Sequence, residues 1–144
     1  MGRDAMTWAN TSASICYLIA ALGSIGFGLV YLARSTFMPY HRDAISTPWE
    51  KLEKPYQALF LGLIKVAGGG FLVSGLSVVF MASFPFRAGE EWARFAIPIV
   101  GLSMAFPALF ATVHVRRHTP ASPPVATTLI TIALLLVGFA LSMV

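Results

Sequence analysis

Four long apolar runs, almost free of charged residues, constrain this chain more than any other feature. They cover about residues 12–33, 56–83, 92–115 and 125–144. A helix that crosses a bilayer needs about 20 mostly apolar residues, and each run reaches that length. The sequence therefore predicts an all-α membrane protein, a four-helix transmembrane bundle that forms a single domain over residues 1–144.

The composition agrees with this interpretation and excludes several classes of protein. Hydrophobic residues make up 57% of the 144 residues and charged residues only 11%, whereas soluble domains carry about 25% charged residues. A chain of this kind is not disordered, not a coiled coil, not a nucleic-acid-binding protein and not an ordinary cytosolic enzyme. Cys16 is the only cysteine, so an intrachain disulfide and a cysteine-rich zinc site are excluded as well.

Basic residues near the ends of the runs predict the orientation, because cytoplasmic loops carry an excess of Lys and Arg. The loops after the first and third runs hold six of these residues, whereas the N-terminal segment and the middle loop hold three and the C-terminus none. The six are Arg34, Arg42, Lys51, Lys54, Arg116 and Arg117. We therefore expect these two loops in the cytoplasm and both termini on the opposite side.

The loop between the first two runs contains a helix-start signal. Thr47 and Glu50 have the spacing of a capping box, and Pro48 stands at the first helical position. Trp49 and Leu52 would share one apolar face. We expect a short helix here, lying in the membrane interface just before the second span.

Lys65 is the one charged residue deep within a run, and it has two alternative interpretations. It lies nine residues after Tyr56, a depth of roughly 14 Å at 1.5 Å per residue. Its side chain can extend back to the headgroups. Alternatively, it faces another helix as a functional group, where it would meet the Ser103 carbonyl that Pro107 leaves without a helical partner, an anionic substrate group or a lipid phosphate.

Small residues on two of the runs predict close helix packing. Ala20, Ser24 and Gly28 form a ridge on the first run, and Gly62 and Gly69 lie with Lys65 on one stripe of the second. The triple glycine at 68–70 has two interpretations as well. It provides a close contact between helices, or it breaks the helix to line a cavity.

Three histidines fall on the predicted cytoplasmic side. His114 and His118 are four residues apart, which places them on one helix face, and His41 lies in the adjoining loop. Together they are a weak candidate for a metal site; the alternative is contact with lipid headgroups. No cofactor is expected, because no histidine pair lies in mid-span and no nucleotide motif occurs.

Several stretches resemble a family of small, uncharacterised, four-span bacterial membrane proteins. They are MPYHRDAI at 38–45, FPFRAGEEWAR at 84–94, RRHTPASPP at 116–124 and GFALS at 138–142. The resemblance implies the same four-span shape and a bacterial membrane, and the orientation predicted from the basic residues would then place both termini in the periplasm, at the inner membrane. The resemblance implies no function.

For function, the absence of catalytic motifs favours an accessory or structural membrane protein, either a homo-oligomer or a subunit of a larger complex. One alternative is a small transporter or channel for an anionic or apolar solute that uses Lys65. The other is an enzyme that acts on a lipid or apolar substrate at the cytoplasmic face through Lys65 or the histidines. The expected partners are the lipid bilayer and further membrane subunits, with no nucleic acid.

Overall fold

The computed structural model describes residues 2–144, with side chains from residue 8 onward, and this part of the chain contains helices and no strands. The helices are α1 (Gly2–Ala33), α2 (Pro39–Ile45), α3 (Lys54–Ser83), α4 (Glu91–His118) and α5 (Val125–Ser142), with a 3-10 turn, η1, at Trp49–Lys51. Four of them, α1 from Trp8 onward, α3, α4 and α5, are long and apolar enough to cross a membrane. The predicted four-span architecture is confirmed.

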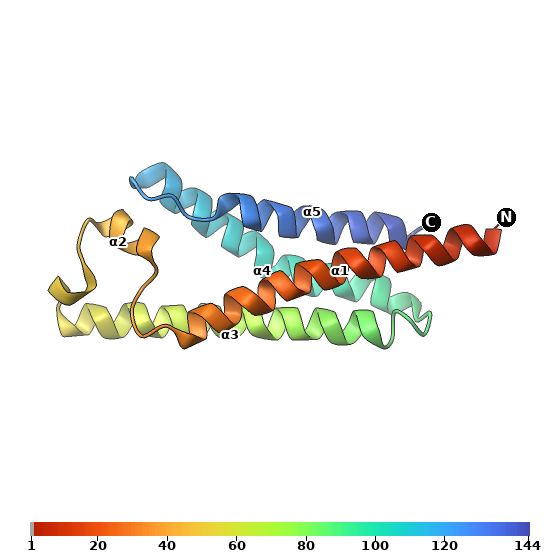
Figure 1. Ribbon diagram of the computed structural model, residues 1–144, viewed down its shortest axis with the longest axis horizontal. Coiled ribbons are helices and arrows are strands. Elements are labelled where there is room, and N and C mark those ends of the chain that lie inside the picture. The colour runs from red at the N-terminus through yellow and green to blue at the C-terminus, as the bar shows by residue number, and fades with distance from the viewer. Residues whose placement is uncertain (1) are drawn as a thin grey trace.

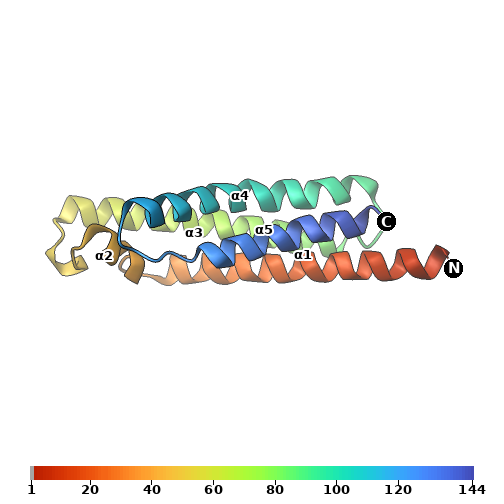
Figure 2. The ribbon, with the colours of Figure 1, turned by 90° about the horizontal axis from the view of Figure 1, so that it is seen from above.

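The four long helices form an antiparallel bundle (Figures 1 and 2). Helix α1 packs against α3 and α5, and α4 packs against the same two neighbours from the other side. Both termini lie at one end of the bundle together with the α3–α4 turn, and we call this the termini end (Figure 1). The opposite end carries α2, η1 and the α4–α5 loop, and we call it the α2 end.

The interfacial helix lies at a different place from the predicted one. Helix α2 starts after Met38, where Pro39 occupies the first turn and the Met38 amide donates to Nδ1 of His41 at 3.2 Å. It ends at Ser46, whose φ of 52° is left-handed. The helix expected to start at Thr47 is only the single turn η1. It cannot continue, because Glu53 is extended and is the N-cap residue of α3.

Helices α1 and α3 form the closest pair in the bundle. A methyl group added at Gly28 would lie 2.7 Å from the backbone nitrogen of Leu72, and one added at Gly75 would lie 2.8 Å from the carbonyl oxygen of Ala21. The backbones touch at these levels, so only glycine fits. The Ser24 hydroxyl reinforces the pair by donating to the carbonyl of Phe71 at 2.8 Å.

The main core occupies the half of the bundle near the termini end. Its largest fully buried side chains are Tyr17, Val78, Ile97 and Leu135, which come from all four long helices. A second cluster lies at the α2 end, where Phe37 and Ile64 pack with Tyr31 and with further apolar residues of α1, α3 and the segment between them. This second cluster attaches the α2 segment to the side of α3, so the bundle interior between the two clusters is left to the long helices alone.

Candidate functional site

Lys65 binds the carboxyl end of α1. Its Nζ donates to the backbone carbonyls of Leu32 and Arg34, at the point where α1 ends at Ala33. The last carbonyls of a helix have no partner within the helix and carry partial negative charge. The ammonium satisfies two of them from a neighbouring helix, so Lys65 is a cap of α1.

This contact also shows where Lys65 lies along the bundle axis. Because α1 ends beside it, the eleven α3 residues from Lys54 to Ile64 extend past α1 by about 16 Å at 1.5 Å per residue. The sequence estimate counts depth from the start of the second apolar run, whereas the structure gives the position of Lys65 relative to the end of α1. The residue lies at the level where the chain leaves the bundle.

The structure does not bring Lys65 to Ser103 and Pro107. The ammonium bonds to carbonyls of α1, whereas Ser103 and Pro107 are exposed on α4. The Ser103 hydroxyl donates to the Val100 carbonyl of its own helix at 2.8 Å. The expected contact between Lys65 and the Ser103 carbonyl is therefore corrected, and no site forms from these three residues.

The predicted small-residue ridges divide into two groups. Ala20 is buried, and Ser24 and Gly28 lie in the α1–α3 contact. Gly62 and Gly69 have no atom within 4 Å of the place where a methyl group would be added, so they do not pack within this chain. On α3 the contact is made by Gly75 and by Gly68, and the helix continues unbroken through the triple glycine.

The histidines lie apart in two groups. His118 and His114 are exposed neighbours on α4, with ring centroids 4.2 Å apart and Nδ1 of His118 bonded to the His114 carbonyl at 2.8 Å. His41 is half-buried on α2. Among the side chains from residue 8 onward, no group of three metal-binding residues is assembled, so the expected set His41, His114 and His118 is not brought together.

Two titratable groups of α2 are shifted by their burial. Desolvation, together with a hydrogen bond between the Tyr40 and Tyr31 hydroxyls, raises the pKa of Tyr40 above its ordinary value. Burial lowers the pKa of His41 below its ordinary value. Both shifts favour the neutral forms. The α2 segment is therefore held against the bundle by uncharged contacts.

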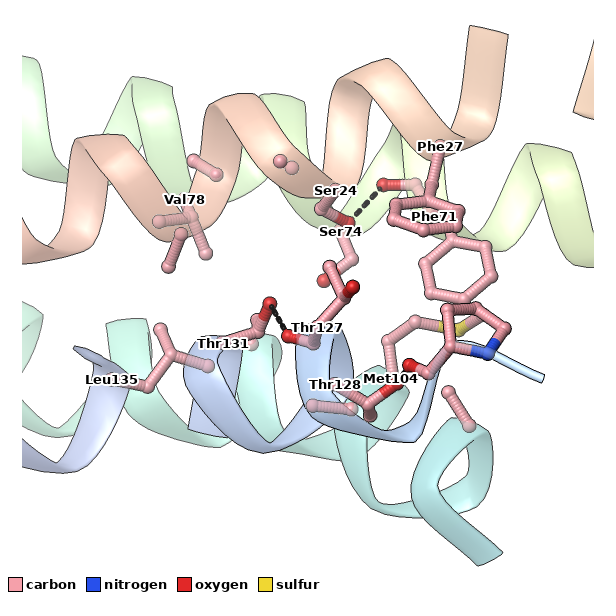
Figure 3. Close-up of a pocket in the computed structure, with 18 of the residues that line it drawn as sticks. Ser24, Phe27, Phe71, Ser74, Val78, Met104, Thr127, Thr128, Thr131 and Leu135 are labelled. Atoms are coloured by element: carbon pink, nitrogen blue, oxygen red, sulfur yellow. Dashed lines mark hydrogen bonds between the residues drawn. The ribbon is translucent and has the colours of Figure 1, made fainter. Parts of the chain in front are cut away.

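The most distinctive feature of the bundle is a cavity that the sequence does not predict, although Ala20 and Ser24 of the predicted packing ridge line it. It has a volume of about 60 Å³ and lies between all four long helices in the half towards the α2 end. Figure 3 shows Ser24 and Ser74 on one side and Thr127, Thr128 and Thr131 on the other. We call it the intrabundle cavity.

The cavity exists because small residues face one another across the bundle axis. Its walls include Ala21 of α1, Ser74 of α3, Ala105 of α4 and Thr128 of α5. None of these side chains is long enough to reach the opposite helix. Leu135 closes the cavity where the main core begins.

Most hydroxyl groups of the cavity already have acceptors in the helices. Ser74 donates to the Val100 carbonyl at 3.3 Å, Thr112 to Ala108 at 2.9 Å and Thr131 to Thr127 at 3.1 Å. A hydroxyl that bonds a carbonyl of its own or a neighbouring helix does not require a polar ligand. The walls are therefore apolar in effect, and no acidic, basic, histidine or cysteine side chain lines them.

The cavity opens sideways. Most of its lining is buried or half-buried, but Gly23 of α1 and Thr127 of α5 are exposed. Nothing lies within 4 Å of a methyl group placed on Gly23. The opening thus lies between α1 and α5 and faces the surroundings of the bundle, which in a four-span membrane protein are lipid.

Comparisons with models of protein families, with curated proteins and with solved structures find no match to this chain. The candidate site therefore stands on the geometry alone. The sequence does carry one signal for it, namely the three threonines at 127, 128 and 131 in an otherwise apolar span.

Proposed function

We propose that the chain is an accessory integral membrane protein that works by holding an apolar chain from the bilayer, and that it does not catalyse a reaction. The observation that carries this proposal is the intrabundle cavity, which is lined by short and apolar side chains and opens sideways between α1 and α5. A protein surrounded by lipid meets acyl chains at high concentration, so an apolar opening at this depth is matched to that occupant.

The positions of the reactive side chains support a binding role. Lys65 is absent from the cavity lining and is bonded to the end of α1. The histidines are also absent from the lining, so the cavity hydroxyls have no base beside them of the kind that activates a nucleophile. A transporter that uses Lys65 and an enzyme that uses the histidines both lack a supporting contact.

The distribution of charge supports an orientation with the α2 end in the cytoplasm. Seven Lys and Arg residues and three acids lie between residues 34 and 65 or at 116–117, whereas the remaining segments carry three of each. The whole net charge of +4 is therefore at the α2 end. By the positive-inside rule, both termini would face the periplasm of a bacterial inner membrane.

Self-association, or assembly into a larger membrane complex, is a second candidate role supported by a separate observation. Gly26, Gly62 and Gly69 have open space around them. Glycines on outward helix faces allow a second membrane helix to approach closely. Native mass spectrometry from a mild detergent would report copy number and bound lipid in the same spectrum. A strictly monomeric protein would contradict the self-association role.

The experiment that tests the proposed function fills the cavity. Thr131→Phe directs a ring into the space that Figure 3 shows beside Thr131, and Ile130→Phe places the same ring on the exposed face of α5 as a control. We expect native mass spectrometry to detect a retained lipid in the unmodified protein and in the control, and to lose it in Thr131→Phe. Equal lipid retention in both variants would contradict the proposal.

A further inference from the structure

We propose that the occupant of the intrabundle cavity is an anionic phospholipid, with one acyl chain in the cavity and its phosphate at Arg116. This inference rests on the proposed function and adds the class of ligand. It combines three features: the size of the cavity, the position of Arg116 on the helix face that lines the cavity, and the distribution of charge between the two ends of the bundle.

The cavity volume limits what can enter. A water molecule needs about 10–15 Å³ of such space, so about 60 Å³ accommodates roughly four to six waters. At about 30 Å³ of liquid volume each, this corresponds to roughly 120–180 Å³ of matter. Pockets that enclose a whole drug-sized ligand measure about 300–1,000 Å³. The cavity is therefore too small for a ring cofactor or an entire lipid, but it can hold a short length of one acyl chain.

Arg116 continues the helix face of α4 that lines the cavity. Ala105, Ala108 and Thr112 line the cavity at spacings of three and four residues, and Arg116 follows Thr112 by four. Residues four apart lie one above the other on a helix, about 6 Å apart along its axis. Arg116 thus stands one turn beyond the cavity lining, towards the α2 end, where a headgroup would lie if its chain entered the cavity.

The guanidinium of Arg116 is free to bind an anion. Arg116 is exposed, and the only ion pair found among the side chains from residue 8 onward joins Arg42 to Asp43. Arginine offers several donors in a planar fork that matches phosphate oxygens. The surplus of basic residues at the α2 end would also repel a cationic headgroup and attract an anionic one.

Arg117 provides a matched control for Arg116. It has the same charge, it is also exposed, and it lies in the same last turn of α4. One residue along a helix is a rotation of about 100°, so Arg117 points away from the cavity face. A general attraction of anionic lipid to the basic end would depend on both arginines equally, whereas the proposed site depends on Arg116.

The test uses the full chain in phosphatidylcholine vesicles that contain a minor share of phosphatidylglycerol with a photoreactive group in one acyl chain. We expect labelled peptides from the cavity faces of α1, α4 and α5. In Arg116→Gln, the labelling should fall about fivefold, the effect of losing about 1 kcal/mol for one basic residue near an anionic surface. In Arg117→Gln, the labelling should remain at the level of the unmodified protein.

The outcomes separate this inference from the proposed function. If Arg116→Gln labels as strongly as Arg117→Gln, or a photoreactive phosphatidylcholine labels as strongly as phosphatidylglycerol, the headgroup assignment is overturned while lipid binding stands. If Thr131→Phe also leaves the labelling unchanged, the proposed function is overturned too. Excess inorganic phosphate should not displace the lipid, and displacement would reassign Arg116 to a soluble anion.

Discussion

The two halves of the bundle use small residues in opposite ways. Towards the termini end, two glycines each face a large side chain: a methyl group added to Gly138 would lie 2.8 Å from the Tyr17 ring, and one added to Gly101 would lie 2.7 Å from the Leu135 side chain. Towards the α2 end, Ala, Ser and Thr face one another across the axis and leave the intrabundle cavity. Across the bundle axis, a small residue thus leaves space unless a large side chain stands opposite it, as Tyr17 and Leu135 do.

The largest expected difference between the halves comes from removing a large side chain. Tyr17 is fully buried in the packed half, so Tyr17→Ala should lower the free energy of unfolding by about 3–5 kcal/mol, the usual cost of emptying an aromatic site. Phe27 borders the cavity and is half-buried. Phe27→Ala should cost less than half as much, because its ring already has empty space on one side.

Unfolding in mixed detergent micelles measures both of these variants. Tyr17→Leu is the companion variant, because it keeps most of the volume and remains folded if the alanine variant does not. Equal losses for Tyr17→Ala and Phe27→Ala would mean that the cavity half is packed as tightly as the core, and the contrast between the two halves would have to be abandoned.

The next effect concerns the contact that ties the ends of α1 and α3 together. Lys65→Met removes the ammonium that serves the carbonyls of Leu32 and Arg34. Hydrogen bonds to charged groups contribute about 1.5–3 kcal/mol, and we expect a loss of stability in that range. The control is Lys54→Met, since Lys54 is exposed and contacts only Gln57 at 3.5 Å. Unchanged stability in Lys65→Met would contradict the capping role.

A smaller change in stability is expected when one methyl group is added to a glycine in each half of the bundle, and the two changes can be compared directly. Gly138→Ala forces a carbon against the buried Tyr17 ring and should destabilise by about 1–3 kcal/mol, the usual cost of overpacking. Gly23→Ala enters open space and should stabilise by up to about 1 kcal/mol, because alanine favours the helix. Thermal unfolding in detergent gives both signs, and two changes of the same sign would refute the contrast.

The sequence was sufficient for the architecture because length and apolar character decide what can cross a bilayer. It also identified Lys65 as unusual, but it did not identify the partner. Helix α1 ends at Ala33. The residues of the second run do not indicate that this end lies beside Lys65. Depth counted along one helix has no meaning until the neighbouring helix ends are known.

The sequence does not predict the cavity either, again because the arrangement of the neighbouring helices is needed. Ser24 and Gly28 were assigned to packing, and in the structure they contact α3. Thr128 and Thr131 drew no prediction, because threonine in an apolar span usually bonds to its own helix, as Thr131 does here. Only the arrangement of the four helices shows that these small side chains face one another across the bundle axis, and one sequence does not reveal that arrangement.

The smallest expected effect is a pH dependence confined to the α2 end. Burial lowers the pKa of His41 from its ordinary value of 6.5, so the unfolded α2 segment takes up a proton at a higher pH than the docked one. The stability of docking is therefore fully present above about pH 6.5 and is lost as the pH falls through the lower, folded pKa. The ring centroids of His41 and Phe37 lie 6.2 Å apart, and those of Phe37 and Trp49 lie 5.0 Å apart.

Trp49 can therefore report the loss of docking by fluorescence in a variant whose other tryptophans, Trp8 and Trp92, are replaced by phenylalanine. We expect a red shift on acidification, since undocking exposes Trp49, and no shift in a variant that retains only Trp92 in the packed half. His41→Gln should abolish the shift, and His114→Gln should preserve it. A shift that persists in His41→Gln would assign the pH response to another group and remove the link between the α2 end and His41 protonation.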